Sequence, residues 1–173
     1  MLKKLLSLLV LSVIATSAWA QTSQSASRSL SLTIVPFLTV TGTRDISFGT
    51  ARRIDGPLFS SATNYAEWTV DTDPGNSVSI SFTLPTQMIN GAATSFPVAL
   101  TYGAASAYID QNASQFSPAT GLGNDIVPNG HAVLRLGFPQ HGTGTDELVK
   151  ADISNAKSGS YTAVVTATVS VNP

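Results

Sequence analysis

The chain has 173 residues, of which only 11% are charged, with nine Lys and Arg against ten Asp and Glu. This balance, without a basic cluster, argues against a nucleic-acid-binding protein. The chain contains no cysteine, which excludes disulfide bonds, a thiol nucleophile and the acylated N-terminus of a lipoprotein. A sparsely charged chain is typical of an extracellular module that packs against copies of itself, and equally of other secreted β-proteins.

Residues 1–20 have the pattern of a secretory signal peptide. Lys3 and Lys4 precede an apolar run over residues 5–14, which is too short for a stable membrane anchor. Residues 18–20, Ala-Trp-Ala, form a small-x-small cleavage site. We expect cleavage before Gln21, with an uncleaved anchor as the alternative. No later segment is apolar and long enough to span a membrane, so we expect an exported protein in the periplasm, on the cell surface or outside the cell.

Cleavage leaves 173 − 20 = 153 residues with a formal charge near −3. Residues 21–28 are polar and rich in serine, and we expect a flexible leader there. Residues 29–173 are then one domain of ordinary size, able to bury most of its apolar surface without a disulfide.

Strict alternation of apolar and polar side chains marks both ends of this domain. The first alternating stretch runs from Leu30 to Val40, and it predicts a strand over residues 29–41 with Pro36 as an edge position or kink. The last runs from Tyr161 to Val171. A period of two predicts an extended strand with one buried face.

Between these ends, similar patterns separated by turn residues predict further strands. Residues 46–48, 65–71, 77–84, 97–102, 107–109 and 132–138 fit this description. The segment 73–76, Asp-Pro-Gly-Asn, predicts a tight turn. Residues 110–128 are polar and predict a surface excursion, and residues 147–156 predict one helical turn at most. The sequence therefore predicts an all-β fold, an immunoglobulin-like antiparallel β-sandwich of about seven or eight strands.

Catalytic and metal-binding patterns are weak. His131 and His141 lie in loop-like sequence without a recognisable nucleophile or third metal ligand. Asp71 and Asp73 resemble the start of a calcium loop, but the twelfth position is Phe82 rather than an acid, so a capped hairpin turn is favoured. We expect no enzyme activity, no catalytic residue, no metal and no cofactor.

Three aromatic residues could form a platform for a sugar, although aromatic residues on strands are more often part of a core. They are Tyr65, Trp68 and Tyr102. This observation keeps open an alternative function, a monomeric secreted adhesin or carbohydrate-binding module.

Two segments resemble small secreted bacterial β-sandwich proteins of the fimbrial type. Residues 38–49, LTVTGTRDISFG, are similar to the opening strand and following Phe-Gly pair of these proteins, and residues 158–171, SGSYTAVVTATVSV, resemble their closing strand. The nearest relatives by this resemblance are pilins of the archaic chaperone–usher pathway and spore-coat-U-like proteins. Many such subunits carry a disulfide near the N-terminus, and this chain departs from them in having none.

The resemblance implies assembly by strand addition, in which an N-terminal extension of one subunit fills a groove in its neighbour. The candidate donor residues are Leu30, Leu32 and Ile34, which could instead belong to the first strand of their own sandwich. The implied function is that of a non-catalytic fimbrial or surface-filament subunit. Its implied partners are copies of itself and a periplasmic chaperone, with no nucleic acid and no stable membrane span.

Overall fold

The computed structural model describes residues 29, 31–33, 35–91, 93–142 and 144–172. The predicted signal peptide and the polar leader lie outside these residues. The chain divides into two units, Met1–Ile34 and Val35–Pro173, and the strands found among the described residues lie in the second unit.

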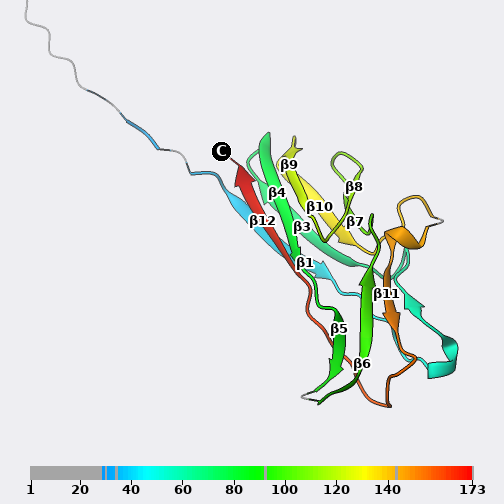
Figure 1. Ribbon diagram of the computed structural model, residues 1–173. Helices are drawn as coiled ribbons and strands as arrows, with labels where there is room; N and C mark the ends of the chain where they lie inside the picture. The colour runs from blue at the N-terminus through cyan, green and yellow to red at the C-terminus, as the bar shows by residue number, and fades with distance from the viewer. Residues whose placement is uncertain (1–28, 30, 34, 92, 143, 173) are drawn as a thin grey trace, which may run out of the picture. The chain divides into compact units, whose positions relative to one another are not determined.

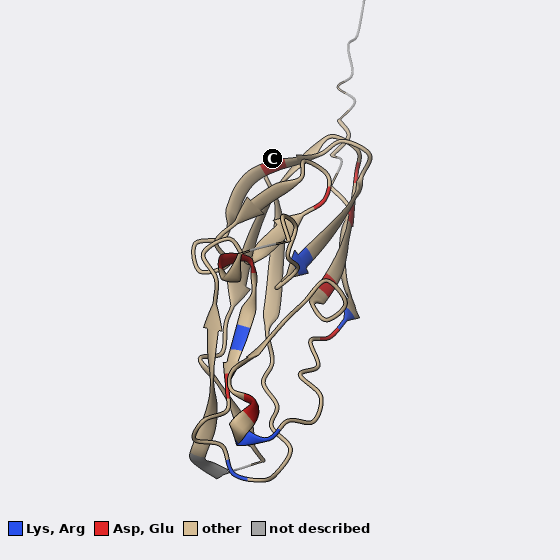
Figure 2. Cartoon of the chain, turned by 90° about the vertical axis from the view of Figure 1, so that its right-hand side faces the viewer, with Lys and Arg blue, Asp and Glu red and all other residues tan. Residues whose placement is uncertain are grey.

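The fold is all-β, antiparallel and sandwich-like, which confirms the fold class predicted from the sequence (Figure 1). The described residues form twelve strands, seven of which have six or more residues. Regular helix in this part of the chain is limited to two 3₁₀ turns, η1 (Arg53–Asp55) and η2 (Thr145–Glu147). Charged residues are few and lie on strands, turns and loops (Figure 2).

The strands form three sheets. The five-stranded sheet has the order β1 (Leu38–Arg44), β3 (Ala66–Thr72), β10 (His131–Leu136), β7 (Ala107–Ile109) and β8 (Ser114–Phe116). The three-stranded sheet has the order β12 (Thr166–Asn172), β4 (Asn76–Thr83) and β9 (Leu122–Val127). The four-stranded sheet has the order β2 (Leu58–Phe59), β11 (Val149–Asp152), β6 (Ala93–Tyr102) and β5 (Gln87–Asn90).

The main core lies between the five-stranded and three-stranded sheets. Val70 of β3 and Leu134 of β10 face Val78 of β4 and Val127 of β9, and all four are fully buried. Period-two alternation places these side chains on the inner faces. A second, smaller core lies under the four-stranded sheet and is built on Val98, Ala151, Ile153 and Ala156.

Predicted strands in the middle of the chain agree with β3, β4, β6, β7 and β10 to within a few residues. The turn at residues 73–76 also forms, with the Asn76 amide donating to the Asp73 carbonyl at 3.2 Å. Residues 110–128, for which we predicted a surface excursion, contain two strands that the sequence did not predict, β8 and β9, and these form the edges of two sheets.

The strand predicted over residues 29–41 begins only at Leu38. Pro36 has no N–H to donate to a ladder. The Phe37 amide instead donates to the Asp73 carboxylate at 3.0 Å, and the Phe37 carbonyl accepts from the Thr72 hydroxyl at 2.7 Å. The backbone of Phe37 is therefore bonded to side chains at the β3–β4 turn rather than to the backbone of a neighbouring strand.

Two other predicted strands are also shorter than expected or absent. Residues 46–48 form no strand, because the Ser47 amide donates to the Asn64 side chain at 2.7 Å rather than to a neighbouring strand. The final strand begins at Thr166 rather than Tyr161. Before it, an isolated bridge joins Thr162 to Ile89 of β5.

Two carboxylates are held by basic side chains. Glu67 accepts from Arg135 at 2.9 Å, and Glu147 accepts from the His141 amide at 3.0 Å and from its ring at 2.8 Å. Burial by itself raises the pKa of each carboxyl, but interactions with Arg135 and Thr43 outweigh it for Glu67, and interactions with Gln115 and His141 outweigh it for Glu147. The pKa of both carboxyls therefore lies below its ordinary value of 4.5.

We predict that acid weakens the fold through these two carboxylates. Because their folded-state pKa values are lowered, their contribution to stability is present above pH 4.5 and is lost as the pH falls through the lower folded values. The free energy of unfolding, measured in urea from pH 7 to pH 3, should fall less steeply below pH 4.5 in Glu147→Gln than in the unchanged protein. An identical slope for the two proteins would contradict this assignment.

Truncation of the main core should be costly. Leu134 is fully buried at the centre of the sandwich, and Leu134→Ala should lower the free energy of unfolding by about 3 kcal/mol. Val164→Ala is the matched control, since Val164 is 79% exposed, and its effect should stay within about 0.5 kcal/mol. Denaturant titration of both variants tests the position of the core.

Candidate functional site

The sandwich has two edge strands on the same side of the molecule. β12 pairs with β4 from Thr166 to Asn172, and β1 pairs with β3 from Leu38 to Arg44. Neither edge strand pairs with a second strand among the described residues. β1 and β12 run close to each other in opposing sheets (Figure 1), and we call the unpaired region between them the β1/β12 seam.

The inward faces of both edge strands are only half-covered. Every second side chain along β12 and the residue before it packs against the main core but remains half-buried. These side chains are Val165, Ala167, Val169 and Val171. Leu38 of β1 is half-buried in the same way. Interior strands, by contrast, bury several of their inward residues completely, such as Val70 of β3, Val78 of β4 and Leu134 of β10. The seam therefore exposes an apolar row beside unpaired backbone groups, which is the arrangement that accepts an added strand.

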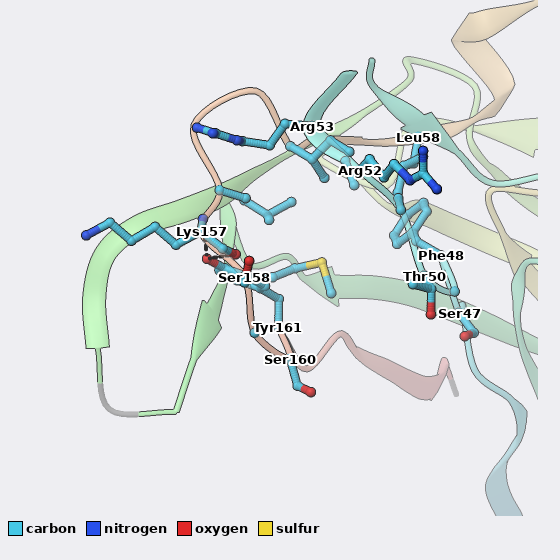
Figure 3. Close-up of a pocket in the computed structure, with 18 of the residues that line it drawn as sticks. Ser47, Phe48, Thr50, Arg52, Arg53, Leu58, Lys157, Ser158, Ser160 and Tyr161 are labelled. Carbon is cyan, nitrogen blue, oxygen red and sulfur yellow. Dashed lines mark hydrogen bonds between the residues drawn. The ribbon is translucent and has the colours of Figure 1, made fainter. Parts of the chain in front are cut away.

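A cavity of about 1010 Å³ lies at one end of this seam (Figure 3). One wall is residues 46–53, which follow β1, and the other is residues 157–161, which precede β12. The second core supplies the floor, with Val98, Ala151 and Ile153 among its residues. The cavity therefore belongs to the same open edge as the seam.

The cavity has basic side chains on both walls and no carboxylate among its lining residues. Arg52 and Arg53 come from one wall and Lys157 from the other. In the close-up, Arg53 and Lys157 extend toward the left of the view, whereas Arg52 extends to the right (Figure 3). The Lys157 ammonium also lies 3.9 Å from the centre of the Phe96 ring, a cation–π contact.

Two of the three predicted donor residues, Leu30 and Ile34, lie outside the described residues. The third, Leu32, is 84% exposed, and no strand includes it. Val35 and Phe37 are also exposed. The described part of this stretch thus carries large apolar side chains in contact with solvent, and the donor role of Leu30, Leu32 and Ile34 stays a prediction.

The acid and histidine candidates make local contacts. The Asp71 carboxylate lies 2.6 Å from the His131 ring, and the Asp73 carboxylate accepts from Phe37. His141 binds Glu147 as described above. The turn forms, but the Asp71 carboxylate contacts the neighbouring strand β10 and the Asp73 carboxylate contacts Phe37, so the contacts of these carboxylates are not those of a turn cap.

The three aromatic residues considered as a sugar platform pack against other parts of the sandwich rather than forming an exposed surface. Trp68 makes an edge contact with Phe82, with ring centres 5.8 Å apart, and Tyr65 is 8% exposed. The Tyr102 hydroxyl donates to the Pro85 carbonyl at 3.0 Å, and burial raises the pKa of Tyr102 to about 12. These three residues do not form a common exposed face.

Sequence reasoning missed the cavity. Its walls are irregular segments, which carry no periodic signal. The available signals were local: the pair Arg52-Arg53 in a chain with few charges, and Lys157 before the Ser-Gly-Ser lead-in to the last strand. Nothing in the sequence indicated that these two segments, more than 100 residues apart, form opposite walls.

No family model matches the chain, and no curated protein sequence matches it. Within the residues that the structure describes, no helix has the length and apolar character needed to cross a membrane.

The open edge of β12 predicts an alternating pattern of amide exchange. With one neighbouring strand, every second N–H of β12 is bonded to β4 and the others point away from it. Residue-resolved hydrogen exchange should therefore show alternating slow and fast amides over residues 166–172. Uniformly slow exchange would show that the free protein already fills the seam.

Proposed function

We propose that this protein is an exported, non-catalytic structural subunit of a fimbrium or surface filament that assembles by strand addition. The observation that carries the proposal is the β1/β12 seam, where two unpaired strand edges border a half-buried apolar row. The resemblance of residues 38–49 and 158–171 to fimbrial β-sandwich proteins supports the same function. On this proposal, a periplasmic chaperone protects the seam before assembly.

The chain also carries a suitable donor. Leu30, Leu32 and Ile34 share one parity of an alternating segment, so an extended chain would present them together to the seam. The seam offers a complementary row at the same two-residue spacing, Val165, Ala167, Val169 and Val171. Backbone hydrogen bonds to β1 and β12 would supply affinity, and the alternate side chains would set the register.

The alternative of a monomeric carbohydrate-binding module draws less support. Its candidate platform consists of Trp68, Tyr65 and Tyr102, which pack against other side chains of the sandwich. The open edge at the β1/β12 seam, in contrast, is a feature that strand addition requires.

A charge placed in the seam should block assembly. Val169→Asp introduces a carboxylate on the inward face of β12, where an added strand would have to desolvate it. Ser170→Asp is the matched control, because Ser170 is the exposed neighbour on the opposite face of the same strand. Electron microscopy and light scattering of the purified mature protein should show filaments with Ser170→Asp and with the unchanged sequence, but not with Val169→Asp.

Removal of the donor should have the same effect without loss of fold. A variant lacking residues 21–35 should remain monomeric, and its unfolding midpoint should equal that of the unchanged protein in its monomeric form. Its seam should bind a synthetic peptide of residues 29–35. Equal assembly with and without residues 21–35, or a deletion variant that fails to bind the peptide, would contradict strand addition by this segment.

A further inference from the structure

We propose that the cavity between residues 46–53 and 157–161 binds an acidic, extended segment of a different protein, at the end of the strand that fills the seam. The inference rests on the proposed function of the seam and names the chemistry of its partner. Three observations carry it: the charge of the rim, the unpaired backbone of the walls and the composition of the chain's own arm.

Charge is concentrated at this cavity. Of the six Lys and Arg residues after residue 28, three line it, namely Arg52, Arg53 and Lys157. None of the ten acidic residues does. The nearest in sequence to the arginines, Asp55, accepts a 2.6 Å hydrogen bond from the Arg52 backbone amide within the η1 turn. The lining of the cavity therefore has a net positive charge, which is complementary to a carboxylate.

The backbone of the walls indicates an extended occupant. Residues 46–51 and residues 158–160 make no backbone-to-backbone hydrogen bond within the described part of the chain. Both segments border an apolar floor that includes Met88 and Ile153. Except for the Ser47 amide, which donates to the Asn64 side chain, these segments carry peptide groups that lack a backbone partner beside an apolar floor. This arrangement suits a peptide chain, which can bond to the walls and bury alternate side chains.

The chain's own arm does not supply the acid. Between Gln21 and Arg44 there is no Asp or Glu, and the first acidic residue is Asp45. The two charged residues of this stretch are Arg28 and Arg44, both basic. A second copy could therefore fill the apolar seam, but its arm brings no carboxylate to the basic rim. The best occupant of the seam and cavity together is a segment of another protein, with apolar alternation followed or preceded by acidic residues.

The test measures binding of labelled, C-terminally amidated peptides to the mature protein at low salt. Leu30, Leu32 and Ile34 are replaced by serine in this protein so that its own arm does not compete. The parent peptide has the sequence of residues 29–35. Extensions of Glu-Glu, Ser-Ser or Lys-Lys are added at either end, so that the preferred end also reports the direction of the added strand. The Glu-Glu peptide should bind about fivefold more tightly than the Ser-Ser peptide at one end only, and the Lys-Lys peptide should bind more weakly.

The triple variant Arg52→Gln/Arg53→Gln/Lys157→Gln should abolish this preference and leave the affinity for the Ser-Ser peptide unchanged. Lys150→Gln is the control, because Lys150 lies on β11 outside the cavity lining and should leave the preference intact. Equal binding of all three extended peptides, or a preference that survives the triple variant, would overturn the acidic-partner inference while leaving strand addition standing. Failure of every peptide to bind would overturn the proposed function as well.

Discussion

An uncovered row of apolar side chains along one edge of the sandwich is the constraint on which the rest of this structure depends. Inside the sandwich, each strand has neighbours on both sides and a sheet opposite, so Val70, Val78 and Leu134 lose all contact with water. At the β1/β12 seam each strand has a neighbour on one side only, and Val169 and its neighbours of the same parity stay half-buried. Full burial of a valine side chain is worth about 1.5–3 kcal/mol relative to exposure, so several such residues leave a substantial driving force for an added strand.

The composition of the chain makes this driving force more important. Without cysteine, no disulfide bond restricts the conformations of the unfolded chain. With few charged residues, there are also few ion pairs. Stability must come from the two apolar cores and the sheet ladders. A strand that completes the seam would extend both of these sources at once, since it would cover the main core and pair two strand edges.

The sequence predicted the class of fold because period-two alternation reports directly on a half-buried strand, as in residues 77–84, which became β4. It was less successful at the ends of the domain. Alternation continues through Leu30, Leu32 and Ile34, but Pro36 and the side-chain contacts of Phe37 delay the first strand to Leu38. Alternation of apolar and polar residues indicates which face of a strand could be buried. Whether the strand forms depends on hydrogen bonding to partner strands that are distant in the sequence. The cavity could not be predicted for the same reason, because its two irregular walls meet only in the folded chain.

The contact between Phe37 and the β3–β4 turn has a mechanical consequence. The amide and carbonyl of Phe37 are held by Asp73 and Thr72, so tension along the chain at Phe37 acts first on these two contacts. From there it passes into β1, which lies antiparallel to β3 along its length. Tension along β1 loads its hydrogen bonds to β3 in shear, so that they share the load rather than break one after another. β1 therefore transmits tension from the Phe37 contacts into the five-stranded sheet.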